Sequence, residues 1–87
     1  MANVVHHPRG KLVAITGAAR GIGKATARAL VEQGAKVAIG DIDVATGEAT
    51  AREIGPSCTA LGLDVTDRSS VDDFVEAVET AHGPIDV

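Results

Sequence analysis

The sequence predicts an α/β fold in which a doubly wound parallel sheet is built from alternating strands and helices. Short apolar runs, each expected to form a buried strand, lie at 11–16, 36–40 and 58–65. Helical periodicity or helix-end signals mark the segments 22–31, 44–54 and 66–83. Strands that alternate with helices of this length require parallel pairing and right-handed crossovers, so we expect helices on both faces of the sheet.

The first two helices are bounded by glycine. In the helix at 22–31, small and apolar residues are expected to form the buried stripe: Ile22, Ala25, Ala29 and Leu30. Gly34 is expected to end this helix as a left-handed C-terminal cap. The helix at 44–54 is stopped by the Gly-Pro pair at 55–56.

The third helix, within 66–83, carries the clearest amphipathic stripe of the chain: Val71, Phe74, Val75 and Val78. Asp67 and Ser69 are its candidate N-caps, because their oxygens can accept hydrogen bonds from free N–H groups of the first turn. After this helix the run 85–87 begins a fourth apolar strand, in which we expect the sheet to be truncated.

The length of 87 residues allows one domain at most. We expect residues 1–10 to be a polar leader and residues 11–87 to be the N-terminal part of a single domain, poorly stable in isolation. Cys58 is the only cysteine, which excludes an internal disulfide, fits a reducing compartment and predicts a buried free thiol.

Composition argues against several classes of partner. A net charge of −4 and a single aromatic residue, Phe74, do not suit nucleic acid, which requires clustered cations or stacking platforms. No run approaches the length of a membrane span, and the leader lacks the apolar core of a secretory signal, so we expect a soluble, cytoplasmic protein. His6 and His7 are neighbours without nearby ligand partners, and no metal site is expected.

Three glycines, Gly17, Gly21 and Gly23, lie where the first strand turns into the first helix. Without Cβ atoms, such a loop lets phosphates approach backbone N–H groups at the positive end of the helix dipole. An acid, Asp41, follows 24 residues after Gly17 at the end of the second strand. This combination is typical of a dinucleotide site, although the glycine spacing is G-x-x-x-G-x-G.

Two alternatives compete for the glycine loop. A phosphate-binding P-loop would need glycine at Ala18 and a hydroxyl residue at Ala25, so phosphoryl transfer is disfavoured. The glycines could also serve only the close packing of helix against strand.

Four stretches together resemble the short-chain dehydrogenase/reductase family: "TGAARGIG" at 16–23, "VAIGDID" at 37–43, "LDVTD" at 63–67 and "GPIDV" at 83–87. The first is similar to the TGxxxGIG cofactor motif of that family. The resemblance implies a Rossmann-type domain that binds NAD or NADP, and an NAD(P)-dependent oxidoreductase that transfers a hydride between nicotinamide and an alcohol or ketone.

The resemblance also implies cofactor contacts. Gly17, Gly21 and Gly23 would shape the loop, while the backbone N–H of Ile22 would bind the pyrophosphate. The side-chain contacts would be Asp41 to the adenosine ribose, Ile42 beside the adenine, Asp64 to the adenine amino group and Val65 in the same pocket. For Asp64 the alternative is a strand-end cap on the third helix, and Asp43 is expected to be only a turn residue.

Two residues favour different cofactors. Asp41 suits the free 2′-hydroxyl of NAD, because a carboxylate beside the 2′-phosphate of NADP is strongly unfavourable. Arg20 is a basic residue directly before the second glycine, where the family resemblance associates such residues with NADP. We expect this arginine to swing into solvent, and therefore NAD is the predicted cofactor.

Catalytic residues are not expected within this chain. The family resemblance implies a serine, a tyrosine and a lysine beyond the third strand, and the sequence has no tyrosine and no lysine after Lys36. Two function classes stay open: the N-terminal part of an oxidoreductase that works as a dimer or tetramer, or a non-catalytic dinucleotide-binding module or relic. A tyrosine followed four positions later by a lysine, further along the gene, would favour the enzyme.

Overall fold

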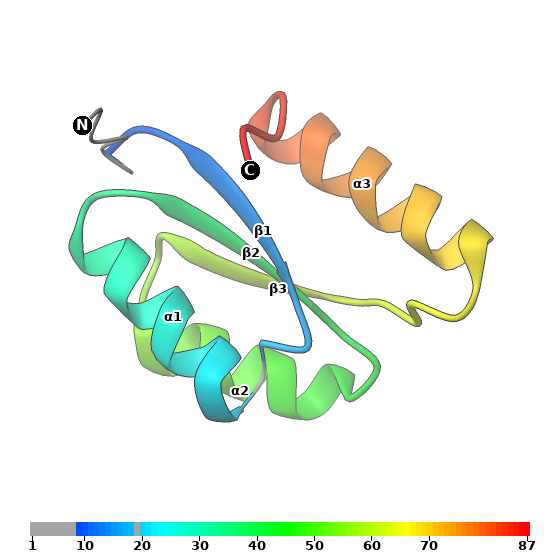
Figure 1. Cartoon of the computed structure of the whole chain (residues 1–87), viewed down its shortest axis with the longest axis horizontal. Coiled ribbons are helices and arrows are strands. Elements are labelled where there is room, and N and C mark those ends of the chain that lie inside the picture. Colours follow the sequence, from blue (N-terminus) through cyan, green and yellow to red (C-terminus); the bar gives the residue numbers. More distant parts are fainter. Residues whose placement is uncertain (1–8, 19) are drawn as a thin grey trace, which may run out of the picture.

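The computed structural model of the chain describes residues 9–18 and 20–87. Within them three strands alternate with three helices, which confirms the predicted α/β fold (Figure 1). The strands are β1 (Leu12–Thr16), β2 (Lys36–Asp41) and β3 (Cys58–Gly62). The helices are α1 (Gly21–Glu32), α2 (Val44–Ile54) and α3 (Arg68–His82).

The strands form one parallel sheet in the order β1-β2-β3. Val37 of β2 pairs with Val13 on one side and with Cys58 on the other, so β2 is the central strand. Helices α1 and α2 cover one face of the sheet and α3 covers the other (Figure 1). The sheet is therefore doubly wound, as predicted.

Each face of the sheet has its own core. On the side of α1 and α2 the buried residues are Ala18, Ala27, Val37, Ile39, Ala51 and Cys58. On the side of α3 they are Leu12, Ala38, Leu63, Phe74 and Val78. Because successive side chains of a strand point to opposite faces, the apolar run of β2 supplies both cores.

Residues 85–87 lie along the edge of β1. The N–H of Ala14 donates to the carbonyl of Val87 at 2.9 Å, and the N–H of Val87 donates to the carbonyl of Leu12 at 3.2 Å. These two bonds are the pattern of a parallel ladder. The predicted fourth run thus begins beside β1 and parallel to it, so the order in which strands are added to the sheet reverses after β3.

The buried stripe predicted for α1 is wrong at three of its four positions. The side chain of Ile22 is 87% exposed, and Ala25 and Ala29 are also exposed, whereas Ala27 is fully buried. Leu30, with Val31, packs partly buried against the same core. Small residues face the sheet here, because they let the helix axis come close to the strands.

Several boundaries also differ from the prediction, all but one of them by only one or two residues. β3 ends at Gly62 and not at residue 65, because the chain turns at Asp64, whose carboxylate accepts a hydrogen bond from the N–H of Thr66. Asp67 alone caps α3, and Ser69 is the residue whose N–H it accepts. Gly34 has a φ of 94° after α1, as expected of a left-handed cap.

Candidate dinucleotide site

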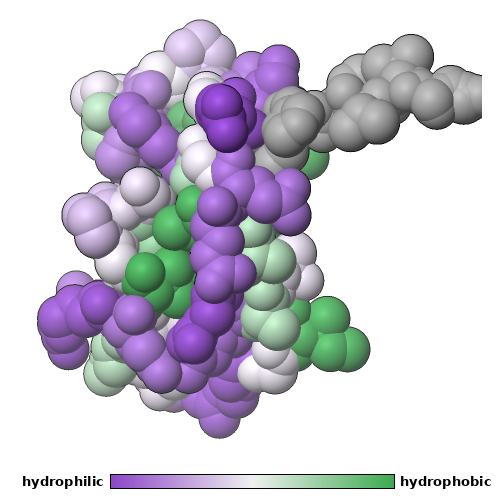
Figure 2. All heavy atoms as spheres, turned by 90° about the vertical axis from the view of Figure 1, so that its left-hand side faces the viewer, coloured by the Kyte–Doolittle hydropathy of each residue, from purple (hydrophilic) through white to green (hydrophobic). Residues whose placement is uncertain are grey.

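The carboxyl ends of the three strands lie at the same end of the sheet (Figure 1). A cleft lies at this end, where ligands of such sheets bind. It has a volume of about 260 Å³ and is lined by Gly17, Gly40, Asp41, Ile42, Leu63, Asp64, Val65 and Thr66. Five of these residues were predicted from the sequence. Figure 2 shows the opposite end of the sheet, where hydrophilic residues predominate around a small apolar patch.

The glycine loop begins with a tight turn. Gly17 and Gly21 have φ angles of 67° and 64°, a backbone conformation that side chains with a Cβ rarely adopt. The N–H of Gly17 donates to the carbonyl of Gly40 at 2.8 Å, which ties the loop to β2. These two glycines are needed for the path of the backbone itself.

Gly23 has a different role, which is close packing. A Cβ at this position would lie 2.7 Å from the Cα of Ala18 and 2.9 Å from the carbonyl oxygen of Gly17. Both atoms belong to the backbone and cannot rotate away. The packing alternative therefore accounts for Gly23, whereas it does not account for the positive φ angles of the other two glycines.

Helix α1 starts without a side-chain cap. Its N-cap residue, Arg20, makes no capping hydrogen bond, and the first turn carries no acid. In α2 and α3, by contrast, Asp43 and Asp67 accept hydrogen bonds from the first turn. The amino end of α1 therefore keeps its partial positive charge, and no acid of its first turn offsets it.

Asp41 is the last residue of β2 and lines the cleft. Its Oδ1 accepts a hydrogen bond from the N–H of Asp43 at 2.9 Å, which fixes the turn that follows. The next side chain, Ile42, is 73% exposed, although it is a large apolar residue. A carboxylate and an exposed apolar side chain thus lie next to each other at the rim of the cleft.

Asp64 and Val65 line the other side. Oδ1 of Asp64 accepts from the N–H of Thr66 at 3.0 Å and from its hydroxyl at 2.6 Å, and the pKa of this carboxyl is lowered by these bonds. Since Asp67 caps α3, the alternative role of Asp64 as that cap is wrong. Val65 is 63% exposed.

Arg20 does not line the cleft. Its Nη2 lies 2.8 Å from Oδ2 of Asp43, and Arg20 lines a separate groove between α1 and α2. Asp43 is more than a turn residue, because it also caps α2 by accepting from the N–H of Thr46 at 3.1 Å. Arg20 was expected to swing freely into solvent, and in the structure it forms an ion pair with Asp43 instead.

Three further predicted residues do not line the cleft either: Gly21, Ile22 and Gly23.

Two carboxyl groups near the site, those of Asp43 and Asp64, are expected to make the stability of the fold depend on pH in the acid range. Hydrogen bonds from Thr46, with a smaller effect of Arg20, lower the pKa of Asp43, and Thr66 lowers that of Asp64. A lowered folded-state pKa adds stability above the unfolded-state pKa, and this is lost as pH falls through the folded-state value. We therefore expect the midpoint temperature of thermal unfolding to decrease as the pH is lowered below about 4. Asp43→Asn and Asp64→Asn should each flatten this dependence, and an unchanged slope in both variants would contradict it.

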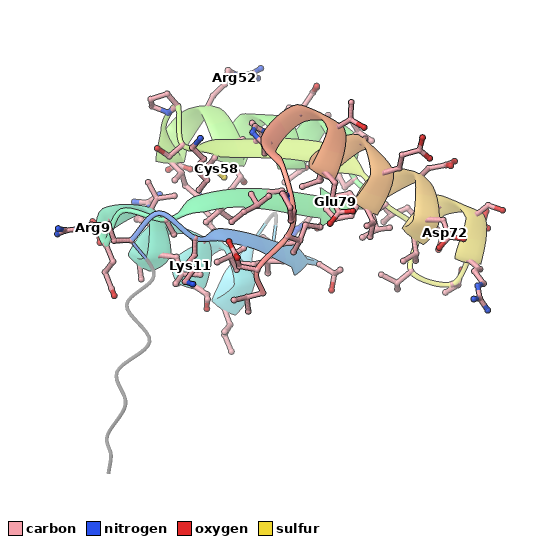
Figure 3. All side chains as sticks on the ribbon, turned by 90° about the horizontal axis from the view of Figure 1, so that it is seen from above. Arg9, Lys11, Arg52, Cys58, Asp72 and Glu79 are labelled. Atoms are coloured by element: carbon pink, nitrogen blue, oxygen red, sulfur yellow. The ribbon has the colours of Figure 1, made fainter. Side chains whose placement is uncertain are left out.

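Outside the cleft, the described residues provide neither a metal-binding group nor an exposed thiol. They include no group of three or more His, Cys, Asp or Glu residues that could hold a metal ion. Cys58 is buried at the start of β3, at the end of the sheet opposite the cleft, and burial raises the pKa of its thiol (Figure 3). His6 and His7 lie outside the described residues. None of the helices in the described part is long and apolar enough to cross a membrane.

The order of elements and the glycine loop at the strand ends define a dinucleotide-binding type of α/β domain. A family model described as short chain dehydrogenase matches residues 11–87. The chain belongs to this family, whose members include oxidoreductases.

Relatives and a solved structure support this assignment. A sorbitol dehydrogenase of Cereibacter sphaeroides is 51% identical over 90% of this chain, and a galactitol 2-dehydrogenase of Agrobacterium fabrum is 49% identical over 88%. A 3-ketoacyl-(acyl-carrier-protein) reductase from Brucella melitensis, solved in complex with NADH, superposes with a TM-score of 0.87 at 40% identity, over 90% of this chain. The chain spans 30% of each of the two curated relatives and 32% of the solved chain.

Proposed function

We propose that this chain is the N-terminal, cofactor-binding part of an NAD-dependent oxidoreductase that acts on an alcohol or ketone. In this proposal residues 11–87 bind the adenosine and pyrophosphate of the cofactor, and catalytic residues come from sequence beyond them. The observation that carries the proposal is the single cleft that Gly17, Asp41 and Asp64 share at the carboxyl ends of three parallel strands.

Each part of the site suits one part of a dinucleotide. The amino end of α1 lacks a side-chain cap, so the N–H groups of Gly21, Ile22 and Gly23 suit a pyrophosphate. The exposed apolar side chains of Ile42 and Val65 suit the two faces of an adenine ring. The solved relative in complex with NADH supports the same class of cofactor.

The carboxylate of Asp41 favours NAD over NADP. It is half-buried at the end of β2, where it can accept hydrogen bonds from ribose hydroxyls. A 2′-phosphate carries nearly two negative charges, and placing it beside this carboxylate is unfavourable. Arg20, which could offset that repulsion, is already paired with Asp43.

The chain's contribution to catalysis is orientation. A bound nicotinamide dinucleotide supplies the hydride donor or acceptor. Residues of this chain hold the far end of that cofactor, and correct orientation of a reacting group can lower a barrier by several kcal/mol. Binding of the adenosine end therefore aims the reactive ring at the part of the protein that holds the substrate.

The names of two relatives, which are polyol dehydrogenases, support an alcohol as the substrate class. We also propose a homo-oligomer, a dimer or a tetramer, for the full-length protein. Size-exclusion chromatography with light scattering would test it, and a monomer at micromolar concentration would contradict it.

Titration of the full-length protein with NAD and with NADP tests the cofactor. We expect NAD to bind at least about tenfold more tightly, because one unfavourable charge contact in a partly buried site changes affinity by this order. Isothermal titration calorimetry measures both Kd values. Tighter binding of NADP by the wild-type protein would overturn the choice of NAD, and binding of neither would overturn the dinucleotide site.

A further inference from the structure

The ion pair of Arg20 with Asp43 connects the two loops that flank the proposed phosphate and ribose sites. Arg20 precedes α1, and Asp43 follows β2 by two residues. The Nη2 of Arg20 lies 2.8 Å from Oδ2 of Asp43. The side chain of Arg20 is 71% exposed and that of Asp43 is 41% exposed, so the arginine is held by this contact and not by burial.

Asp43 is itself held in place from three directions. Its Oδ1 accepts from the N–H of Thr46 at 3.1 Å, and its Oδ2 accepts from the hydroxyl of Thr46 at 2.7 Å. Its own N–H donates to Oδ1 of Asp41 at 2.9 Å. The carboxylate that holds Arg20 is thus fixed, and it is one hydrogen bond away from the acid proposed to bind the ribose.

The only cation among these three residues, Arg20, is already engaged by a carboxylate and is not available to bind a phosphate. Asp41 and Asp43 contribute two negative charges and Arg20 one positive charge, so the three groups together are negative. The other cation that lines the same groove, Lys24, is paired with Glu53 at 2.6 Å. A phosphate on the ribose would therefore meet a net negative charge and an arginine whose guanidinium is already bonded.

We propose that Asp43 is a specificity-determining residue that excludes NADP by holding Arg20 away from the 2′ position of the adenosine ribose. This inference rests on the proposed dinucleotide site. Asp43 acts as a positioning residue through Arg20 and touches no cofactor. When Asp43 loses its charge, the guanidinium of Arg20 is released and can bind a 2′-phosphate, with which an arginine forms strong, often bidentate hydrogen bonds.

The test is a double-mutant cycle on the full-length protein, with Kd measured for NAD and NADP by calorimetry. Asp43→Asn is the first variant, because asparagine keeps the helix cap of α2 while it removes the charge. We expect it to lower the ratio of the Kd for NADP to that for NAD by about three- to fivefold, the upper end for one exposed charge interaction. In the double variant with Arg20→Gln this gain should disappear, since the released cation is then absent.

Controls separate this inference from general charge effects. Glu48→Gln removes one negative charge from the exposed surface of the same helix, α2, and should leave the ratio unchanged. Arg20→Gln alone should change the ratio by less than about twofold, because Asp43 already engages this arginine. This single variant also serves if Asp43→Asn fails to fold.

Three results would overturn the inference. They are an unchanged ratio in Asp43→Asn, a gain that persists in the double variant, or a large loss of NADP affinity in Arg20→Gln alone. Each of them is compatible with tight NAD binding, so the inference can fail while the proposed function stands. Binding of neither dinucleotide by the wild-type protein is the separate result that overturns the proposed function and this inference with it.

Discussion

Replacing Gly23 with alanine is expected to weaken NAD binding at least about tenfold and to destabilise the fold by about 1–3 kcal/mol. The added Cβ would lie 2.7 Å from the Cα of Ala18 and 2.9 Å from the carbonyl oxygen of Gly17. Because both neighbours are backbone atoms, relief requires that α1 move away from the glycine loop. That movement displaces the N–H groups proposed to bind the pyrophosphate.

Calorimetric titration with NAD and thermal unfolding of the full-length protein measure the two effects. Gly47→Ala is the matched control, since Gly47 is also a glycine within a helix. Its added Cβ would meet the Cβ atoms of Ala60 at 3.6 Å and of Asp41 at 3.9 Å, which are ordinary contacts. Alanine also favours a helix by up to about 1 kcal/mol over glycine. Wild-type affinity in Gly23→Ala would show that the loop does not set the position of the phosphate site.

The different roles of the three glycines in the loop show what the sequence could and could not predict. The motif at 16–23 predicted where a strand turns into a helix and that its glycines matter. It did not distinguish the left-handed turn at Gly17 and Gly21 from the steric requirement at Gly23. That distinction depends on how closely the helix approaches the loop, which spacing along the chain does not reveal.

The sequence predicted the order of the elements, and all but one of their boundaries to within two residues, because apolar runs and glycine stops are local signals. The helix at 44–54 has the predicted limits. The buried face of α1 was missed because alanine occurs on several of its sides, so hydropathy offers little contrast between Ala25 and Ala27. The exposed Ile22 then misled the assignment of the stripe.

The site residues that sequence reasoning missed are those whose role depends on tertiary contacts. Thr66 lines the cleft and bonds to Asp64, which the sequence signals only as a short Asp-x-Thr turn. The partner of Arg20 lies 23 residues away, and the two meet because β1 and β2 are adjacent and parallel. Such a pair depends on which strands are neighbours in the sheet, and a local sequence motif carries no information about that.

Replacing Asp41 with alanine is expected to reduce the preference for NAD by about tenfold or more. The change should weaken NAD, because a charged acceptor for the ribose hydroxyls is lost, and it should strengthen NADP, because a carboxylate beside the 2′-phosphate is removed. Calorimetric Kd values for both cofactors measure the two effects separately. Asp41→Asn is a useful second variant, since it keeps an acceptor for the N–H of Asp43.

Asp64→Asn provides the matched comparison for Asp41. Both carboxylates line the same cleft, but Asp64 lies on the side proposed to meet the adenine. If the preference comes from a local contact with the 2′ position, Asp64→Asn should shift both Kd values in parallel, whereas Asp41→Ala should move them in opposite directions. Equal effects of the two variants on the ratio would show that the net charge of the cleft sets the preference. In that case neither Asp41 nor the pair of Arg20 with Asp43 could be assigned to the ribose.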